Sequence, residues 1–242
     1  MKQREAVIQA LEQLGGQATL AQLYHATLKI KDCAWKTRTP EASIRRLVQT
    51  TPEIFKVRPG LWALRAYQKR LGLIEQTSRA ADDLQVIQQG HSFYQGLLLT
   101  IGRLRNFATF APQQDKNQLF INKPLKEVRT LNNIPPFSYP KIVKRCSTVD
   151  VVWFNERGML NSLFEVEHST NIQDSLAKFS DLQDFNTRMV IVAADRRRRD
   201  FEHKLAFNAF NEIKGRVRFL DYESLAQQYE DEMKKQNYGF IV

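Results

Sequence analysis

The chain has 242 residues, 43% of them hydrophobic and 26% charged, so it is long enough for one large or two small domains with ordinary globular cores. Its longest apolar runs, near residues 97–99 and 189–194, are far shorter than the roughly 18 residues of a membrane span, and no apolar signal stretch follows Met1, so we expect a cytoplasmic protein with no membrane partner. A net charge of +10 favours a polyanionic partner, either DNA or RNA.

The chain begins with two predicted helices. Val7, Leu11 and Leu14 recur at the spacing of one helix face, and Gly15-Gly16 should end that helix. Thr19 is a good N-cap for a second helix that starts directly after it, because its side-chain oxygen can accept a hydrogen bond from the first turn. We therefore expect two short helices in close succession.

A third helix and a hairpin follow. Thr39 is expected to be the N-cap of the third helix, and Pro40 suits the first helical position because the N–H that it lacks has no partner there. The short apolar runs on either side of Pro59-Gly60 predict two strands joined by a turn. Three helices followed by a hairpin describe a winged helix-turn-helix domain over residues 1–66.

Two blocks of this region carry a family resemblance. Thr-Pro-Glu-Ala-Ser-Ile-Arg-Arg at 39–46 and Gly-Leu-Trp-Ala-Leu at 60–64 resemble the HARE-type helix-turn-helix, a winged helix of restriction enzymes, chromatin proteins and RNA polymerase subunits. The resemblance covers about the first 65 residues and implies DNA binding. The candidate DNA-binding residues are basic side chains of the recognition helix, of the wing and of the polar stretch before that helix: Arg45, Arg46, Lys56, Arg58, Lys36 and Arg38.

The remainder of the chain predicts a second domain. Residues 67–83 form a polar, charged connector, and from residue 84 to 242 helices and strands alternate, which indicates a mixed β-sheet flanked by helices and an α/β (α+β) fold. The expected elements after a first amphipathic helix are strands at 107–111, 148–154, 160–167, 189–194 and 217–220, and helices at 172–185, 200–213 and 223–234.

Three carboxylates lie on two of these predicted strands. Asp150 is on the strand before the turn at 155–158, and Glu165 and Glu167 are on the strand after it. Side chains alternate along a strand, so Glu165 and Glu167 should share one face. Carboxylates inside apolar strands are unfavourable unless their charge is compensated. Mg²⁺, which prefers carboxylate oxygens and water, would compensate it and could act on a phosphodiester.

This arrangement resembles the PD-(D/E)XK nuclease core. Asp150 matches the aspartate of the motif and Glu165 its second acid, whereas Glu167 stands where the family usually has lysine. The resemblance implies a Mg²⁺ site, in which Mn²⁺ can substitute, with Asp150, Glu165 and Glu167 as ligands. Glu167 is then either a base or a second-metal ligand, or Lys178 on the following helix takes the place of the missing lysine. Three further residues are expected to line the site: Gln95, His91 and His168.

The sequence therefore favours a metal-dependent endodeoxyribonuclease of the restriction-enzyme type that acts on double-stranded DNA, expected as a homodimer because such enzymes commonly cut both strands symmetrically. The alternatives are a DNA-binding regulator with an inactive nuclease fold and an RNA-acting protein. No phosphate-binding Gly-Lys-Ser/Thr loop and no Gly-x-Ser-x-Gly nucleophile motif is present. Cys33 and Cys146 lie far apart without metal-ligand spacing and are expected to be buried free thiols.

Overall fold

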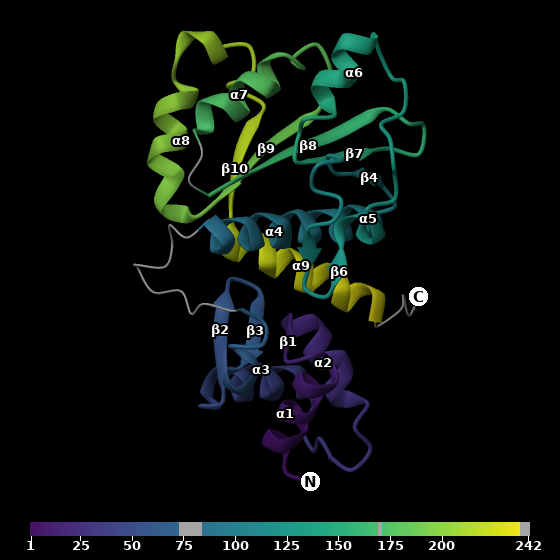
Figure 1. The fold of residues 1–242 in the computed structure, drawn as a ribbon, viewed down its shortest axis with the longest axis vertical. Coiled ribbons are helices and arrows are strands. Elements are labelled where there is room, and N and C mark those ends of the chain that lie inside the picture. The colour runs from purple at the N-terminus through teal and green to yellow at the C-terminus, as the bar shows by residue number, and fades with distance from the viewer. Residues whose placement is uncertain (73–83, 169–170, 238–242) are drawn as a thin grey trace. The chain divides into compact units, whose positions relative to one another are not determined.

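A computed structural model describes residues 1–72, 84–168 and 171–237 of the chain. It divides into two compact units, residues 1–86 with 230–242 and residues 87–229 (Figure 1). Most of the predicted connector, residues 73–83, lies outside the described residues. Within the described ranges, no helix combines the length and the apolar character that crossing a membrane requires. Both cysteines are buried free thiols, as predicted.

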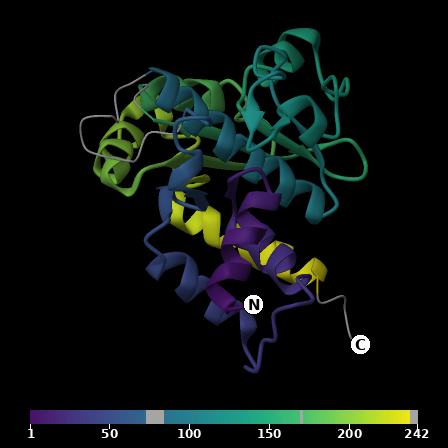
Figure 2. The ribbon, with the colours of Figure 1, turned by 60° about the horizontal axis from the view of Figure 1, so that its bottom comes forward.

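The N-terminal unit has the predicted order of three helices and a hairpin, which can be followed in purple and blue in Figure 2. Its elements are α1 (Gln3–Gln13), β1 (Gln17–Ala18), α2 (Leu20–Leu28), α3 (Pro40–Thr50), β2 (Ile54–Arg58), β3 (Leu61–Leu64) and the 3₁₀ turn η1 (Arg65–Tyr67). The sheet order is β1-β3-β2, with antiparallel pairs. The sequence did not indicate β1, because a strand of two residues is too short to show alternation.

The two predicted N-caps of this unit differ in their bonding. Thr19 and Gln22 form a capping box before α2: the Gln22 N–H donates to Thr19 Oγ1 at 3.3 Å, and the Thr19 N–H donates to Gln22 Oε1 at 2.9 Å. Thr39 is the N-cap of α3, but its side chain makes no capping hydrogen bond. Its backbone, at φ −128° and ψ 71°, is not in the extended conformation of a bonded N-cap. Pro40 therefore sets the start of α3.

The second unit is built on a mixed sheet of five strands in the order β10-β9-β8-β7-β4. Its strands are β4 (Ala108–Phe110), β7 (Val151–Phe154), β8 (Leu160–Glu167), β9 (Arg188–Ala193) and β10 (Val217–Asp221). The pairs β4–β7 and β7–β8 are antiparallel, and β8–β9 and β9–β10 are parallel. A small hairpin, β5 (Leu119–Phe120) and β6 (Lys123–Pro124), lies between the expected strands 107–111 and 148–154, where no strand was predicted. The predicted mixed sheet is confirmed.

The helices and 3₁₀ turns of this part of the chain are α4 (Leu84–Leu104), α5 (Leu125–Val128), α6 (Pro140–Cys146), α7 (Ile172–Ser180), η2 (Asp195–Arg197), α8 (Arg198–Leu205), η3 (Asn208–Phe210) and α9 (Tyr222–Asn237). The expected helices 172–185 and 200–213 both end earlier than predicted. In each case the apolar spacing continues, but the chain tightens into 3₁₀-type bonds, such as Leu182 N to Phe179 O at 3.0 Å and Phe207 N to Lys204 O at 3.2 Å.

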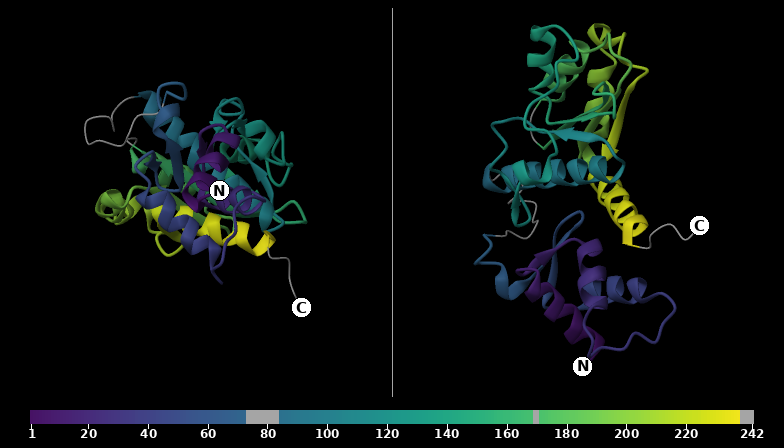
Figure 3. Two further views of the ribbon diagram at one scale, coloured as in Figure 1. Left: turned by 90° about the horizontal axis from the view of Figure 1, so that it is seen from below. Right: turned by 90° about the vertical axis from the view of Figure 1, so that its right-hand side faces the viewer.

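Helices cover both faces of the sheet. Side chains of α7 and α8, such as Leu176 and Phe201, share one buried cluster with Leu163 and Ile191 of the central strands. On the other face, the long helix α4, drawn in blue to teal in Figure 3, approaches β7 so closely that a Cβ atom at Gly102 would meet the Trp153 ring. The sheet is therefore a buried middle layer, and residues at its strand ends are held in fixed positions.

Gly102 gives a stability prediction. A Cβ at this position would lie 2.6 Å from both Thr109 Cγ2 and Trp153 Nε1, and both of those side chains are buried. Gly102→Ala should lower the free energy of unfolding by about 1–3 kcal/mol, although alanine is the better helix former by about 1 kcal/mol. Urea unfolding measures the change. Gly215→Ala is the control, because its Cβ would meet no atom within 4 Å; equal stability of the two variants would contradict the packing described here.

Candidate active site

Asp150 and Glu165 lie side by side at the start of β7. Val151 of β7 pairs with Phe164 of β8, so the residue before one and the residue after the other are neighbours. Asp150 Oδ2 accepts a hydrogen bond from the Val166 N–H at 2.8 Å. The strand expected from residue 148 begins only at Val151, because residues 148 and 149 still donate to the last turn of α6. Asp150 thus lies directly before β7, and its second carboxylate oxygen, Oδ1, lies 3.5 Å from His91 Nε2.

Glu165 and Glu167 are on the sheet face that α7 covers. Ser175 Oγ is within hydrogen-bonding distance of Glu165 Oε2, at 3.1 Å, and of Glu167 Oε1, so its single hydroxyl proton is shared between the two carboxylates. The two glutamates are only 2% and 4% exposed. Burial raises the pKa of Glu165 well above its usual value, the neighbouring Asp150 raises it further, and Lys178 opposes the rise. The ionised form of Glu165 is therefore unfavourable here unless a cation compensates its charge.

Lys178 is the main counter-charge of Glu165. Its Nζ lies 2.8 Å from Glu165 Oε2 and 3.0 Å from Glu165 Oε1, and it donates to the Thr148 carbonyl oxygen at 3.0 Å. Burial lowers the pKa of Lys178, but the carboxylates of Glu165, Asp150 and Glu167 together outweigh burial and leave that pKa above its usual value. The helix that follows the carboxylate strand thus brings an ammonium group into the site, on the residue that the sequence proposed as a displaced lysine.

Glu167 and His168 have different surroundings. Arg197 Nη1 lies 3.7 Å from Glu167 Oε2, and the Tyr222 hydroxyl donates to the Glu167 carbonyl oxygen at 2.9 Å. The same hydroxyl is 3.0 Å from His168 Nδ1. Sequence reasoning did not single out Ser175 or Tyr222. A signal existed for Ser175, which precedes Lys178 by three residues and so shares its helix face.

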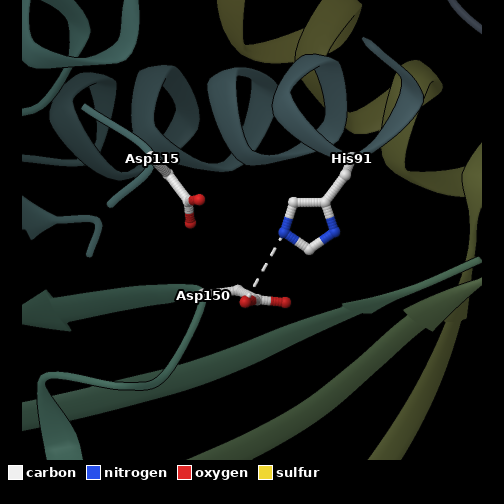
Figure 4. A group of neighbouring side chains, drawn as sticks. All are labelled: His91, Asp115 and Asp150. Carbon is white, nitrogen blue, oxygen red and sulfur yellow. Dashed lines mark ion pairs between the residues drawn. The ribbon is translucent and has the colours of Figure 1, made fainter. Parts of the chain in front are cut away.

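A second group, on the α4 side, consists of His91, Asp115 and Asp150 (Figure 4). His91 Nε2 is 3.5 Å from Asp150 Oδ1, and one potential ligand atom from each of the three residues lies within 4.8 Å of the others. The Gln95 side-chain amide donates to Asp115 Oδ2 at 3.0 Å and to the Asp150 carbonyl oxygen at 3.2 Å. The sequence indicated Gln95 and His91 but not Asp115, which lies in a segment without periodicity.

The acids around His91 determine its charge in the absence of a bound cation. Burial disfavours the imidazolium form, but the carboxylates of Asp150, Asp115 and Glu165 outweigh burial and raise the pKa of His91 to about 9. With a pKa near 9, the His91 imidazole is protonated at neutral pH, and its positive charge offsets part of the negative charge of these acids. The site therefore attracts cations, whether protons or metal ions.

The six DNA-binding candidates differ in exposure. Four of them are exposed: Lys36, Arg38, Arg46 and Lys56. Arg45 is half-buried: its Nε donates to the Tyr24 hydroxyl at 3.1 Å, and its Nη2 is paired with Glu230 of the same unit. Arg58, only 6% exposed, follows a β-bulge that breaks the alternation of β2, so its side chain is buried and not at the surface expected for a DNA contact.

Comparison of the sequence with known proteins places the chain in a family. Residues 73–241 match the family described as the type II restriction enzyme NmeDI C-terminal domain. The chain is 28% identical over 119 residues to the type II restriction enzyme NmeDI of Neisseria meningitidis serogroup C, a match that covers 45% of this chain but only 34% of that protein. No solved structure matches. Because the family spans most of its length, the chain belongs to the family of the NmeDI restriction-enzyme C-terminal domain.

Proposed function

We propose that this chain is a metal-dependent endodeoxyribonuclease of the restriction-enzyme type, with its active site at Asp150, Glu165 and Lys178. The observation that carries the proposal is the meeting of a carboxylate directly before β7, a carboxylate of β8 and an ammonium group of α7, in a chain of a restriction-enzyme family. Asp150 and Glu165 are the two acids that match the PD-(D/E)XK motif, and Lys178 is one of the two candidates, with Glu167, for the role of its missing lysine. Type II restriction enzyme is the description of the relative, and its activity is extended to this chain as part of the proposal.

The donor set suits Mg²⁺, with Mn²⁺ as a substitute. Asp150 and Glu165 offer neighbouring carboxylate oxygens, and hard divalent cations prefer such ligands. Glu165 is buried at 2% exposure with a raised pKa, and a cation would relieve that unfavourable burial of charge. Asp150 and Glu165 would hold the ion. When bound, a divalent cation supplies charge stabilisation at the scissile phosphate and activates the attacking water.

The protein side chains have separate tasks in this proposal. Lys178 contacts both oxygens of Glu165 and so fixes the orientation of that carboxylate. Its ammonium group is also suited to orient a water molecule and to neutralise charge on the phosphate. Glu167, held by Ser175 and close to Arg197, is the less direct participant, either as base or as a second ligand. We favour Lys178 over Glu167 as the functional substitute for the lysine of the motif.

The N-terminal unit is proposed to bind duplex DNA as a winged helix, with α3 as the recognition helix. This proposal is supported by the order of helices and hairpin and by exposed basic side chains on α3 and β2, Arg46 and Lys56. Lys36 and Arg38, just before α3, are two further exposed basic side chains. Positive side chains in these places contact phosphates and base edges.

DNA affinity gives a prediction for this unit. Arg46→Ala combined with Lys56→Ala should weaken binding to duplex DNA and lower the slope of log affinity against log salt by about 1.8, roughly 0.9 per lost phosphate contact. Fluorescence anisotropy at several salt concentrations measures both quantities. The control, Lys31→Ala combined with Lys69→Ala, removes two exposed positive charges from the same unit. Equal slopes in the two double variants would place the DNA-binding surface elsewhere.

The function itself is tested by offering the chain duplex DNA, single-stranded DNA and RNA in Mg²⁺. The DNA should include phage DNA with natural base modifications, since the recognition sequence is undefined. Cleavage restricted to duplex DNA supports the proposal, whereas cleavage of RNA alone would support the RNA-acting alternative. Tight duplex binding without cleavage in any DNA would support an inactive regulator. Light scattering of the cleaving species tests the proposed homodimer.

A further inference from the structure

The α4 side of the site has its own set of potential ligands. His91 comes from α4, Asp115 from the segment between β4 and β5, and Asp150 from the start of β7, so three separate elements bring these side chains together. Figure 4 shows the imidazole of His91 directed toward Asp150, with the Asp115 carboxylate beside them. We propose that these three residues form a nitrogen- and oxygen-liganded divalent-cation site that binds Mn²⁺ in preference to Mg²⁺. This inference deepens the proposed nuclease function, on which its catalytic meaning rests.

The three side chains are close enough to share one ion. The ligand atoms of the three residues lie within 4.8 Å of one another, a spread that one ion can bridge with small side-chain adjustments. Asp150 Oδ2 is engaged by the Val166 N–H, which leaves Oδ1 facing the imidazole. Asp150 is therefore fixed by the β8 backbone while it presents one oxygen to the group.

Gln95 supplies an independent observation. It is fully buried, and its amide group donates to Asp115 Oδ2 and to the Asp150 carbonyl oxygen, so it positions one proposed ligand beside another. Its own oxygen, Oε1, is buried without a hydrogen-bond partner in the described part of the chain. A buried amide fixed in this way is the kind of support that metal ligands receive from neighbouring side chains. Acids on a surface are solvated by water and do not need a buried amide such as that of Gln95 to hold them in place.

The choice of ion follows from the imidazole. Mg²⁺ binds oxygen ligands and retains its waters, whereas imidazole nitrogen suits transition metals. Imidazole binds a metal ion only in its neutral form, so the ion would displace the His91 proton, which is released to solvent. With His91 as one of three ligands, the group suits Mn²⁺ more closely than the all-carboxylate set of Asp150 and Glu165 does. Asp150 would belong to both sets, which places the nitrogen-containing site directly beside the proposed catalytic carboxylates.

The test measures metal binding on the full-length chain without DNA. Electron paramagnetic resonance of free Mn²⁺ gives the affinity, and competition with Mg²⁺ gives the preference. Asp115→Asn and His91→Gln should each weaken Mn²⁺ binding by about tenfold or more. His91→Asp, which replaces nitrogen by oxygen, should lower the Mn²⁺ over Mg²⁺ preference by about tenfold. Asp184→Asn is the control for loss of one exposed acid and should bind Mn²⁺ as the wild type does.

Thermal unfolding without metal checks that each variant folds. Asp115 and His91 lie on different elements, so either variant tests the site by itself. Unchanged Mn²⁺ affinity in folded Asp115→Asn and His91→Gln would overturn this inference, even if the chain cleaves DNA through Asp150 and Glu165. Conversely, wild-type protein that binds Mn²⁺ through these residues but cuts no DNA would support the cation site and count against the nuclease function.

Discussion

Asp150→Ala and Glu165→Ala are each expected to reduce DNA cleavage by roughly a thousandfold or more, which in most assays is no detectable cleavage. Each change removes one of the two neighbouring carboxylates that would hold the cation, and with it the stabilisation of charge on the phosphate. DNA binding should persist, because the exposed basic side chains of the N-terminal unit are unchanged. Loss of an acid near the phosphate should even tighten binding slightly.

Initial cleavage rates and DNA affinity must be measured together on the same preparations. Glu156→Ala is a suitable control, because Glu156 is an exposed acid in the turn that joins β7 and β8. It should cut at the wild-type rate. Cleavage that survives in Asp150→Ala, or a loss of DNA binding as large as the loss of cleavage, would contradict the assignment.

Lys178→Ala is expected to lower the cleavage rate by about 10²–10⁴-fold, the range for a group that assists proton transfer or stabilises developing charge. Lys178 makes two contacts with Glu165, so its loss both frees that carboxylate and removes the ammonium group from the site. Glu167→Gln should be much less damaging, because the amide retains a hydrogen-bond acceptor for Ser175. Single-turnover rates in Mg²⁺ distinguish the two residues.

The cleavage rates of Lys178→Ala and Glu167→Gln decide which of the two residues replaces the lysine of the motif. Lys141→Ala removes an exposed lysine of α6 and is the control for loss of positive charge. If Glu167→Gln is inactive while Lys178→Ala still cuts, Glu167 is the base or second ligand and the preference for Lys178 is wrong. A measurement of folding by thermal unfolding accompanies each variant, since Lys178 compensates a buried charge.

The carboxylate strands were predictable because strand geometry has a period of two residues. Alternation alone places Glu165 and Glu167 on one face, and both contact Ser175 of the following helix. Lys178 was named as a candidate from the sequence, and its contact with Glu165 fits a helix that packs back onto that strand. The pairing that brings Asp150 beside Glu165 follows from the short turn between β7 and β8.

Other features depend on contacts that no local pattern encodes. Asp115 lies in the segment between β4 and β5, which has no periodicity, and its place in the site depends on Gln95 of α4. The burial of Arg58 depends on a β-bulge, which inserts one residue without a sequence signature of its own. The early ends of α7 and α8 depend on 3₁₀ turns that keep the helical spacing of apolar residues.

The central claim is that a metal-dependent site containing Asp150 cuts duplex DNA. It is tested most directly by incubating one set of duplex DNAs, modified and unmodified, with wild-type chain and with Asp150→Ala, first in Mg²⁺, then in excess chelator, then with Mg²⁺ restored. We expect double-strand cleavage by the wild type alone, its loss in chelator and its return with Mg²⁺. Cleavage that ignores the chelator, or that appears equally in Asp150→Ala, would contradict the central claim.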